Sequence, residues 1–152
     1  GGAPVLKFHL SSALKLKPTE VALARLAKMH EPTYLHQTMG RAKDGSIVRF
    51  KDIPLAMAAI DQLRALEELR VHFHVPVNAD RLSDELSTTN DHLRAALDVI
   101  AKAPGACREL EIETYTWEVL PPEVRAADVA DMIAEEYRWT LAELAQRGVK
   151  PL

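Results

Sequence analysis

The chain has 152 residues, of which 47% are hydrophobic and 27% are charged, and its formal net charge is −3. This balance is that of an ordinary folded protein and excludes a disordered chain, and the interspersed charges do not favour nucleic acid as a partner. A single cysteine, Cys107, excludes an internal disulfide and a thiolate-rich zinc site and is compatible with a reducing compartment. No apolar run approaches the ~20 residues that span a bilayer, so we expect a cytoplasmic protein without membrane insertion.

Four strand–helix pairs are predicted along the chain. Strands are indicated by period-2 alternation with β-branched or aromatic residues, and helices by apolar residues at helical spacing behind a capping residue or a proline. In chain order we expect a strand over 5–10, a helix opened by Pro18, a strand over 33–37, a loop or small hairpin over 39–50, a helix opened by Pro54, a strand over 69–75, a helix capped within 88–91, a strand over 109–115 and a helix over 128–148.

Strands that alternate with helices are typical of a parallel sheet with right-handed crossovers, and the strand spacing is near the ~30 residues of a βαβ unit. We therefore predict an α/β fold in which four consecutive βα units form the C-terminal half of a (β/α)8 TIM barrel, because a whole barrel has ~250 residues. Residues 1–152 would then be the C-terminal part of a single domain whose N-terminal half is absent. The start at Gly1 without an initiator methionine is in keeping with a chain cut from a longer one.

The predicted strands carry polar side chains on one face, because successive side chains of a strand point to opposite faces. In a barrel, one face packs against the helices and the other faces the lumen. Imidazole and carboxylate groups in the lumen would suit a divalent metal ion or a polyol. His30 and His92 fall outside the strands and carry no such signal. The polar strand residues are Lys7, His9, Ser11, Tyr34, His36, His72, His74, Glu111 and Glu113.

These residues also have a simpler interpretation. A lone histidine that points inward is more often a hydrogen-bonded core residue than a metal ligand. Because histidines recur on three of the predicted strands, the two interpretations are about equally favoured. Glu111 and Glu113 would be solvated on an edge strand, but Leu110 and Ile112 beside them favour an enclosed position, where glutamate needs a partner. The acids of the last helix are most simply a solvent face, and Cys107 a small hydrophobe.

Four segments carry a resemblance to a known family. They are KFHLSSAL at 7–14, YLHQTMGR at 34–41, VHFHVPV at 71–77 and LEIETYTWEVLPPE at 110–123. In that order they resemble the C-terminal part of the EboE metabolite-traffic family, and the HFHVP and ETYTW segments are the most specific. That family is similar to the xylose-isomerase-like barrels, which include sugar isomerases and epimerases.

The resemblance implies a site at the carboxyl ends of the barrel strands. In the epimerase relatives this site holds a divalent metal, Zn, Mn or Mg, through two carboxyl-bearing residues, a histidine and a further glutamate on the last strand. Glu113 resembles that last glutamate, with Glu111 as the alternative, and Glu113 would also be the catalytic residue. The histidine resembles His36 or His74, and less closely His9, where relatives carry glutamine. The earlier metal-binding strand has no counterpart in this chain. The candidate substrate-binding residues are Lys7, His9, Arg41, His72, Tyr115 and Trp117.

Three hypotheses for the function remain open. The preferred one is an EboE-like TIM barrel protein that acts in metabolite handling or traffic and binds a small polar metabolite in the barrel mouth. The first alternative is a metal-dependent sugar or polyol isomerase or epimerase, in which Glu113 moves a proton or completes the metal shell. The second is a stand-alone α/β domain without a metal site, whose polar strand faces are ordinary hydrogen-bonded core. Self-association into a homo-oligomer is left open.

Overall fold

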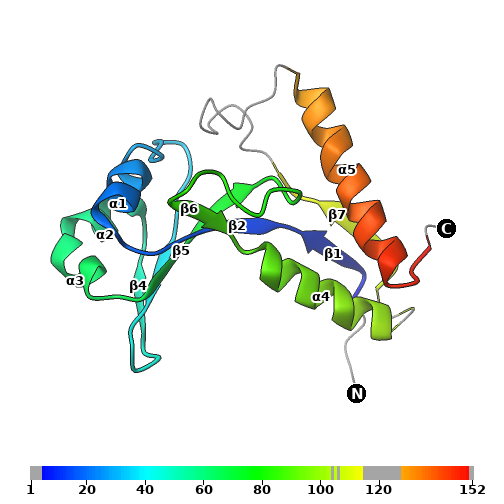
Figure 1. The fold of residues 1–152 in the computed structure, drawn as a ribbon, viewed down its shortest axis with the longest axis horizontal. Helices are drawn as coiled ribbons and strands as arrows, with labels where there is room; N and C mark the ends of the chain where they lie inside the picture. Colours follow the sequence, from blue (N-terminus) through cyan, green and yellow to red (C-terminus); the bar gives the residue numbers. More distant parts are fainter. Residues whose placement is uncertain (1–4, 104, 106, 115–127, 151–152) are drawn as a thin grey trace.

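The structure is a computed structural model that describes residues 5–103, 105, 107–114 and 128–150. Within these ranges the chain forms a five-stranded sheet, a two-stranded sheet and five helices (Figure 1). None of the described helices is both long enough and apolar enough to cross a membrane.

The larger sheet is antiparallel throughout. Its strands lie in the order β4 (Ile47–Phe50), β3 (Thr38–Arg41), β5 (Glu68–Val75), β2 (Ser12–Leu16) and β6 (Leu86–Thr88). Each neighbouring pair runs antiparallel, and β3 and β4 form a hairpin. Gly45 in the hairpin turn has a φ of 82°, a conformation that favours glycine. Gly40 of β3 is needed for a different reason, since a Cβ there would overlap the side chain of Leu66.

Three short helices share a hydrophobic core with this sheet: α1 (Glu20–Ala27), α2 (Ile53–Ala58) and α3 (Ile60–Arg64). The first two begin at good capping residues, because Thr19 accepts a hydrogen bond from the Ala22 amide and Asp52 from the Ile53 amide. The helices and strands bury one shared apolar cluster. We call β2 to β6 with α1 to α3 the antiparallel unit. Its largest buried side chains include Leu14, Leu16, Leu23, Leu26, Ile53, Leu63, Leu69 and Phe73.

The opposite face of the larger sheet is polar. Along β5, Leu69, Val71 and Phe73 are fully buried, whereas Arg70 and His72 between them are partly or largely exposed. Lys15 of β2 lies opposite Arg70 in the register and shares this second face. The sheet therefore has one apolar and one open polar face, as antiparallel sheets commonly do.

The smaller sheet pairs strands from the two ends of the chain. β1 (Lys7–Leu10) runs parallel to β7 (Glu109–Ile112), and α4 (Asn90–Lys102) and α5 (Val129–Gln146) lie beside them (Figure 1). We call these four elements the parallel unit. Its core is small and consists of Leu10, Val77, Leu93, Leu97 and Leu144. Only Ser11 separates β1 from β2, so one stretch of chain contributes to both sheets.

The prediction of four βα units forming half a TIM barrel is wrong. Among the described strands β1 and β7 are the one parallel pair, and the neighbours in the larger sheet are all antiparallel. Parallel strands covered on both faces read as nearly continuous apolar runs, whereas an antiparallel sheet with one open face shows apolar–polar alternation. The alternation that was interpreted as a barrel lumen is the pattern of an antiparallel sheet with a polar open face.

The individual elements were predicted better than their arrangement. The strands expected at 5–10, 69–75 and 109–115 are present as β1, β5 and β7, and the expected helices are present, the second of them as α2 and α3. The hairpin expected within 39–50 is confirmed as β3 and β4, but it forms part of the larger sheet rather than an insertion. Residues 33–37 are not a strand, and β2 and β6 were not predicted.

Candidate functional site

Two groups of polar side chains come together in the structure. The first, which we call the polar strand face, lies on the open side of β1 and β7 and at the end of β5. Its members are Lys7, His9, His72, His74, Glu111 and Glu113. The second, which we call the His30–His36–Asp52 cluster, lies between the end of α1 and the start of α2.

The parallel register of β1 and β7 creates the charged half of the polar strand face. His9 lies opposite Glu111. Its Nε2 is 3.9 Å from Glu111 Oε2, and its Nδ1 is 3.1 Å from Glu113 Oε2. Lys7 forms an ion pair with Glu111. The hydrogen bond from Lys7 holds the pKa of Glu111 below its usual range, and Glu111 raises the pKa of Lys7. The charge of Glu111 is thus matched by Lys7, and the carboxylate of Glu113 faces His9.

Two histidines of β5 form the other half. The Nδ1 of His74 is 2.7 Å from the carbonyl oxygen of Glu113, and its Nε2 is 2.9 Å from Nε2 of His72. A carbonyl oxygen can only accept, so His74 Nδ1 carries a proton and donates it. Between the two Nε2 atoms there is then room for one proton, not two. When both rings are neutral, His72 Nε2–H donates to His74 and the Nδ1 of His72 keeps a lone pair.

The polar strand face is accessible from solvent. The side chains of Lys7, His9, Glu111 and Glu113 are between 39% and 51% exposed. His72 is also exposed, whereas His74 is buried beneath it. Lys7 supplies donors, Glu113 supplies an acceptor, and His72 can supply either. Such an alternation of donors and acceptors suits a hydroxyl-rich ligand.

The His30–His36–Asp52 cluster is built around a buried histidine. His36 is 3% exposed, and its ring lies tilted against that of Phe73, with the ring centroids 5.0 Å apart. The amide of His36 donates to Asp52 Oδ1 at 2.9 Å, and the same oxygen accepts from Ile53, where Asp52 caps α2. One potential ligand atom from each of His30, His36 and Asp52 lies within 4.8 Å of the others, so these three residues could hold a metal ion.

The cluster also sets the protonation of its members. Burial lowers the pKa of His36, and positive charge on His30 or His72 lowers it further, against the opposing effect of Glu31 and Asp52. Burial alone would raise the pKa of Asp52, but the hydrogen bonds from the His36 and Ile53 amides outweigh it and keep that pKa below its usual value. His36 is therefore neutral and Asp52 ionised at neutral pH.

The structure brings some of the predicted site residues together and leaves others apart. Lys7, His9, His72, His74, Glu111 and Glu113 lie together, as described above. Arg41 lies at the far end of β3, where its guanidinium is 3.7 Å from Glu68. Tyr115 and Trp117 lie outside the described residues. His36 contacts Phe73, whose side chain alternates with those of His72 and His74 along β5.

The metal ligands implied by the family resemblance, His36, His74, Glu111 and Glu113, do not fit a metal as a set. Both ring nitrogens of His74 are engaged, and Glu111 is paired with Lys7. Within the described part of the chain, the group of three or more candidate ligands that does converge is His30, His36 and Asp52. His30 and Asp52 were not predicted as site residues, because one follows a helix and the other reads as a helix cap; the His-x5-His spacing was the only available signal.

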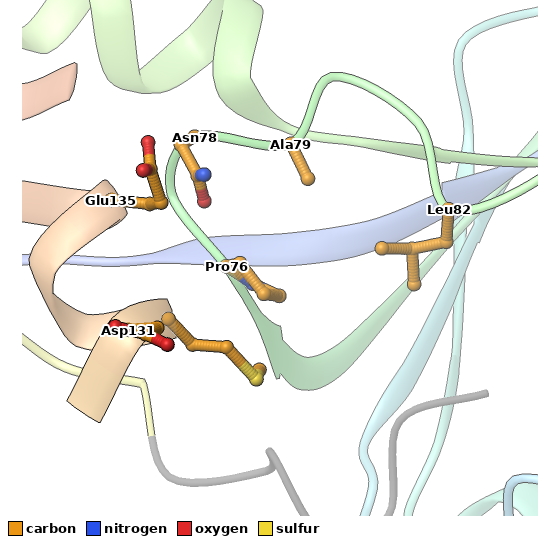
Figure 2. Close-up of a pocket in the computed structure, with 7 residues that line it drawn as sticks. Pro76, Asn78, Ala79, Leu82, Asp131 and Glu135 are labelled. Atoms are coloured by element: carbon orange, nitrogen blue, oxygen red, sulfur yellow. The ribbon is translucent and has the colours of Figure 1, made fainter. Parts of the chain in front are cut away.

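A pocket of about 250 Å³ lies between the segment that follows β5 and the start of α5. Figure 2 shows Pro76, Asn78, Ala79 and Leu82 on one side, with Asp131 and Glu135 of α5 on the other. None of these residues was predicted as part of a site. Glu135 also forms a hydrogen bond with Arg138. The pocket is lined by apolar side chains, by Asn78 and by two acidic residues, but no described side chain of the polar strand face lines it.

Comparisons with protein-family models, with curated proteins and with solved structures found no match to this chain.

Proposed function

We propose that this chain acts in the handling of a small polar metabolite in the cytoplasm and binds that metabolite on the polar strand face. The observation that supports this proposal is the pairing of β1 with β7, which aligns Lys7, His9, Glu111 and Glu113 beside the His72–His74 pair. A ligand with adjacent hydroxyl groups could donate to Glu113 and accept from Lys7. The four segments that resemble the EboE metabolite-traffic family favour the same role.

Binding can be tested by calorimetric titration with a panel of sugars, sugar acids and polyols. For a ligand that binds the wild-type chain, we expect Glu113→Gln to weaken the affinity about 10-fold or more, because hydrogen bonds to charged groups contribute ~1.5–3 kcal/mol. The control is Asp61→Asn, which removes a carboxylate that is 92% exposed on α3 and should leave the affinity unchanged. Equal affinities for Glu113→Gln and the wild type would place the ligand elsewhere.

A second candidate function is an isomerase or epimerase for a sugar or polyol. It is favoured by the 3.1 Å contact between His9 and the Glu113 carboxylate, since such a pair can move a proton to and from a substrate carbon. This chemistry commonly uses a divalent cofactor, and we propose Zn²⁺, Mn²⁺ or Mg²⁺ for any metal that this protein takes. The polar strand face has no ligand set for that metal, and for this reason the enzyme hypothesis ranks second.

The two functions differ in their response to heavy water. An isomerase that removes a proton from carbon should introduce deuterium into its substrate, and Glu113→Gln should abolish that exchange while the substrate still binds. A binding protein should cause no exchange with any ligand of the panel. Proton NMR of the ligand after incubation in deuterated buffer therefore decides between them.

A further inference from the structure

A buried imidazole nitrogen has no hydrogen-bond partner in the described part of the chain. Nδ1 of His36 is shielded from solvent and makes no hydrogen bond to any described residue. The imidazole ring of His36 is buried and contacts the ring of Phe73, so its position is fixed. Leaving a buried polar atom unsatisfied costs ~1–3 kcal/mol, so such an atom in a fixed ring calls for an explanation. The other ring nitrogen, Nε2, lies 3.9 Å from Glu31 Oε1.

We propose that His30, His36 and Asp52 bind a divalent transition-metal ion of the Zn²⁺ class. The donor set is two imidazole nitrogens and one carboxylate oxygen, which suits Zn²⁺, Co²⁺ or Fe²⁺ and does not suit Mg²⁺ or Ca²⁺, whose ligands are almost all oxygens. Three protein ligands leave a fourth position on a tetrahedral ion for water or for an oxygen of a ligand. This inference stands apart from the proposed function, because it concerns other residues and needs no metabolite.

The spacing of the three residues is compatible with one ion. Ligand atoms around a tetrahedral zinc ion, at bond lengths of ~2.0–2.2 Å, lie roughly 3.3–3.6 Å from one another. In the structure the three ligand atoms are within 4.8 Å of one another, so an adjustment of no more than roughly 1–1.5 Å would bring them to one ion. His30 is exposed and can make that adjustment, whereas His36 is fixed.

The surroundings resemble the outer shell of a metal site. A histidine ligand usually presents its second nitrogen to a carboxylate or carbonyl group, and the Glu31 carboxylate lies near Nε2 of His36, at 3.9 Å. Both backbone amides that bond to Asp52 use Oδ1, which leaves Oδ2 as the oxygen for the metal. The carboxylates of Asp52 and Glu31 together carry the two negative charges that match a divalent cation.

The proposed metal site lies elsewhere than the site that the family resemblance implies. The resemblance implies a metal held by strand residues, and His74 and Glu111 are already engaged there. The structure brings its candidate ligands together in the segment between α1 and β3 and at the cap of α2 instead. Of the four residues that the resemblance implies, only His36 is shared with this site.

The experiment is direct metal binding by the full chain. The protein is stripped with a chelator, titrated with Zn²⁺ by calorimetry, and titrated in parallel with Mg²⁺ and with Co²⁺, whose visible spectrum reports nitrogen ligands and geometry. We expect one Zn²⁺ per chain, a Co²⁺ spectrum of low coordination number, and no comparable binding of Mg²⁺. Removal of one ligand should weaken Zn²⁺ affinity about 100-fold or more, since even outer-shell changes cost ~10–100-fold.

The variants are chosen so that loss of metal cannot be mistaken for loss of fold. His30→Ala changes an exposed residue, and Asp52→Asn keeps a good N-cap for α2 while it removes the carboxylate. The matched controls are His92→Ala, an exposed histidine of α4, and His9→Ala, an exposed histidine of the polar strand face. Weak Zn²⁺ binding in both test variants with full binding in both controls supports the site. Wild-type affinity in His30→Ala and Asp52→Asn, loss only in His9→Ala, or no Zn²⁺ binding by the wild type would each overturn it.

Discussion

The antiparallel unit and the parallel unit differ most in the size of their cores. The cluster centred on the antiparallel unit has 17 buried residues, and the cluster of the parallel unit has 5. Hydrophobic stabilisation scales with the apolar surface removed from water, so the antiparallel unit should supply most of the free energy of folding. The charged half of the polar strand face lies on the parallel unit, which buries little apolar surface.

The difference shows how the charged half of the proposed metabolite-binding surface is separated from most of the core. In the antiparallel unit, neighbouring strands β3 and β4 are joined by a tight hairpin. One face of the sheet packs against α1 to α3, and the other face is open to solvent. In the parallel unit, most of the chain separates β1 from β7 in the sequence. The open face of this strand pair carries Lys7, His9, Glu111 and Glu113. Elements with few buried contacts open most readily, and binding surfaces are drawn from them.

The largest expected effect comes from the core of the antiparallel unit. Phe73→Ala removes a fully buried ring, and we expect the free energy of unfolding to fall by about 3–5 kcal/mol. Leu97→Ala, the corresponding change in the parallel unit, should cost less, near the low end of the ~2–5 kcal/mol range, because the smaller core around it can collapse. Urea denaturation of both variants measures the two losses.

Leu141→Ala is the control for that pair. Leu141 lies on α5 and is 46% exposed, so its loss should change stability by no more than about 0.5 kcal/mol. If Leu97→Ala cost as much as Phe73→Ala, the two units would be equally important for folding and the comparison would fail.

A smaller effect is expected at Glu136, which ties α5 to the segments that follow β5 and β7. Glu136 is 1% exposed on α5, and its Oε2 accepts hydrogen bonds from the Val77 amide at 3.0 Å and from the Thr114 hydroxyl at 2.6 Å. Glu136→Ala leaves both donors buried without that acceptor, at ~1–3 kcal/mol each, so we expect a loss of about 2 kcal/mol or more. The Val77 amide should also exchange its hydrogen faster, which NMR can follow residue by residue.

Glu135→Ala provides the matched control for Glu136. It removes the neighbouring glutamate of the same helix, which is exposed and bonded to Arg138 only among the described side chains. Its effect on stability and on Val77 exchange should be close to zero. Unchanged exchange at Val77 in Glu136→Ala would mean that the Glu136 carboxylate does not protect the Val77 amide.

The elements could be predicted from the sequence because they depend on local patterns. Thr19 and Asp52 precede their helices as capping residues do, and the alternation of Leu69 to Val75 defines β5. The pairing of strands could not be predicted in this way. β2 pairs with β5 across more than fifty residues, and nothing in either segment names its partner. The alternation did carry a usable signal, since it argued against fully covered parallel strands.

The candidate site residues likewise divide into contacts that follow from local sequence and contacts that depend on strand pairing. A spacing of two places His72 and His74 on one face of a strand, and this follows from the sequence. The contact of His9 with Glu113 required the β1–β7 register, which joins residues about a hundred positions apart. His30 and Asp52 gave no periodic signal, because their proximity depends on the irregular segment between α1 and β3.

The smallest expected effect concerns a surface link between the units. Lys15 of β2 donates to both carboxylate oxygens of Asp91 on α4 at 2.9 Å. The hydrogen bond from Lys15 lowers the pKa of Asp91 from its ordinary value of 3.8. A carboxyl group whose pKa is lower in the folded state stabilises the fold above its unfolded pKa, and this contribution is lost as the pH falls through the folded pKa.

Lys15→Met keeps the alkyl chain and removes the charge. Because Asp91 is 66% exposed, we expect a loss of only ~0.2–1 kcal/mol at neutral pH, which disappears as the pH falls through the lowered pKa of Asp91 and also disappears in high salt. Lys17→Met, an exposed lysine just past the same strand, should show no pH-dependent difference from the wild type. A Lys15→Met deficit that stayed constant with pH would instead have a cause other than the ionised Asp91. The Lys15–Asp91 ion pair would then contribute nothing to the joining of the two units.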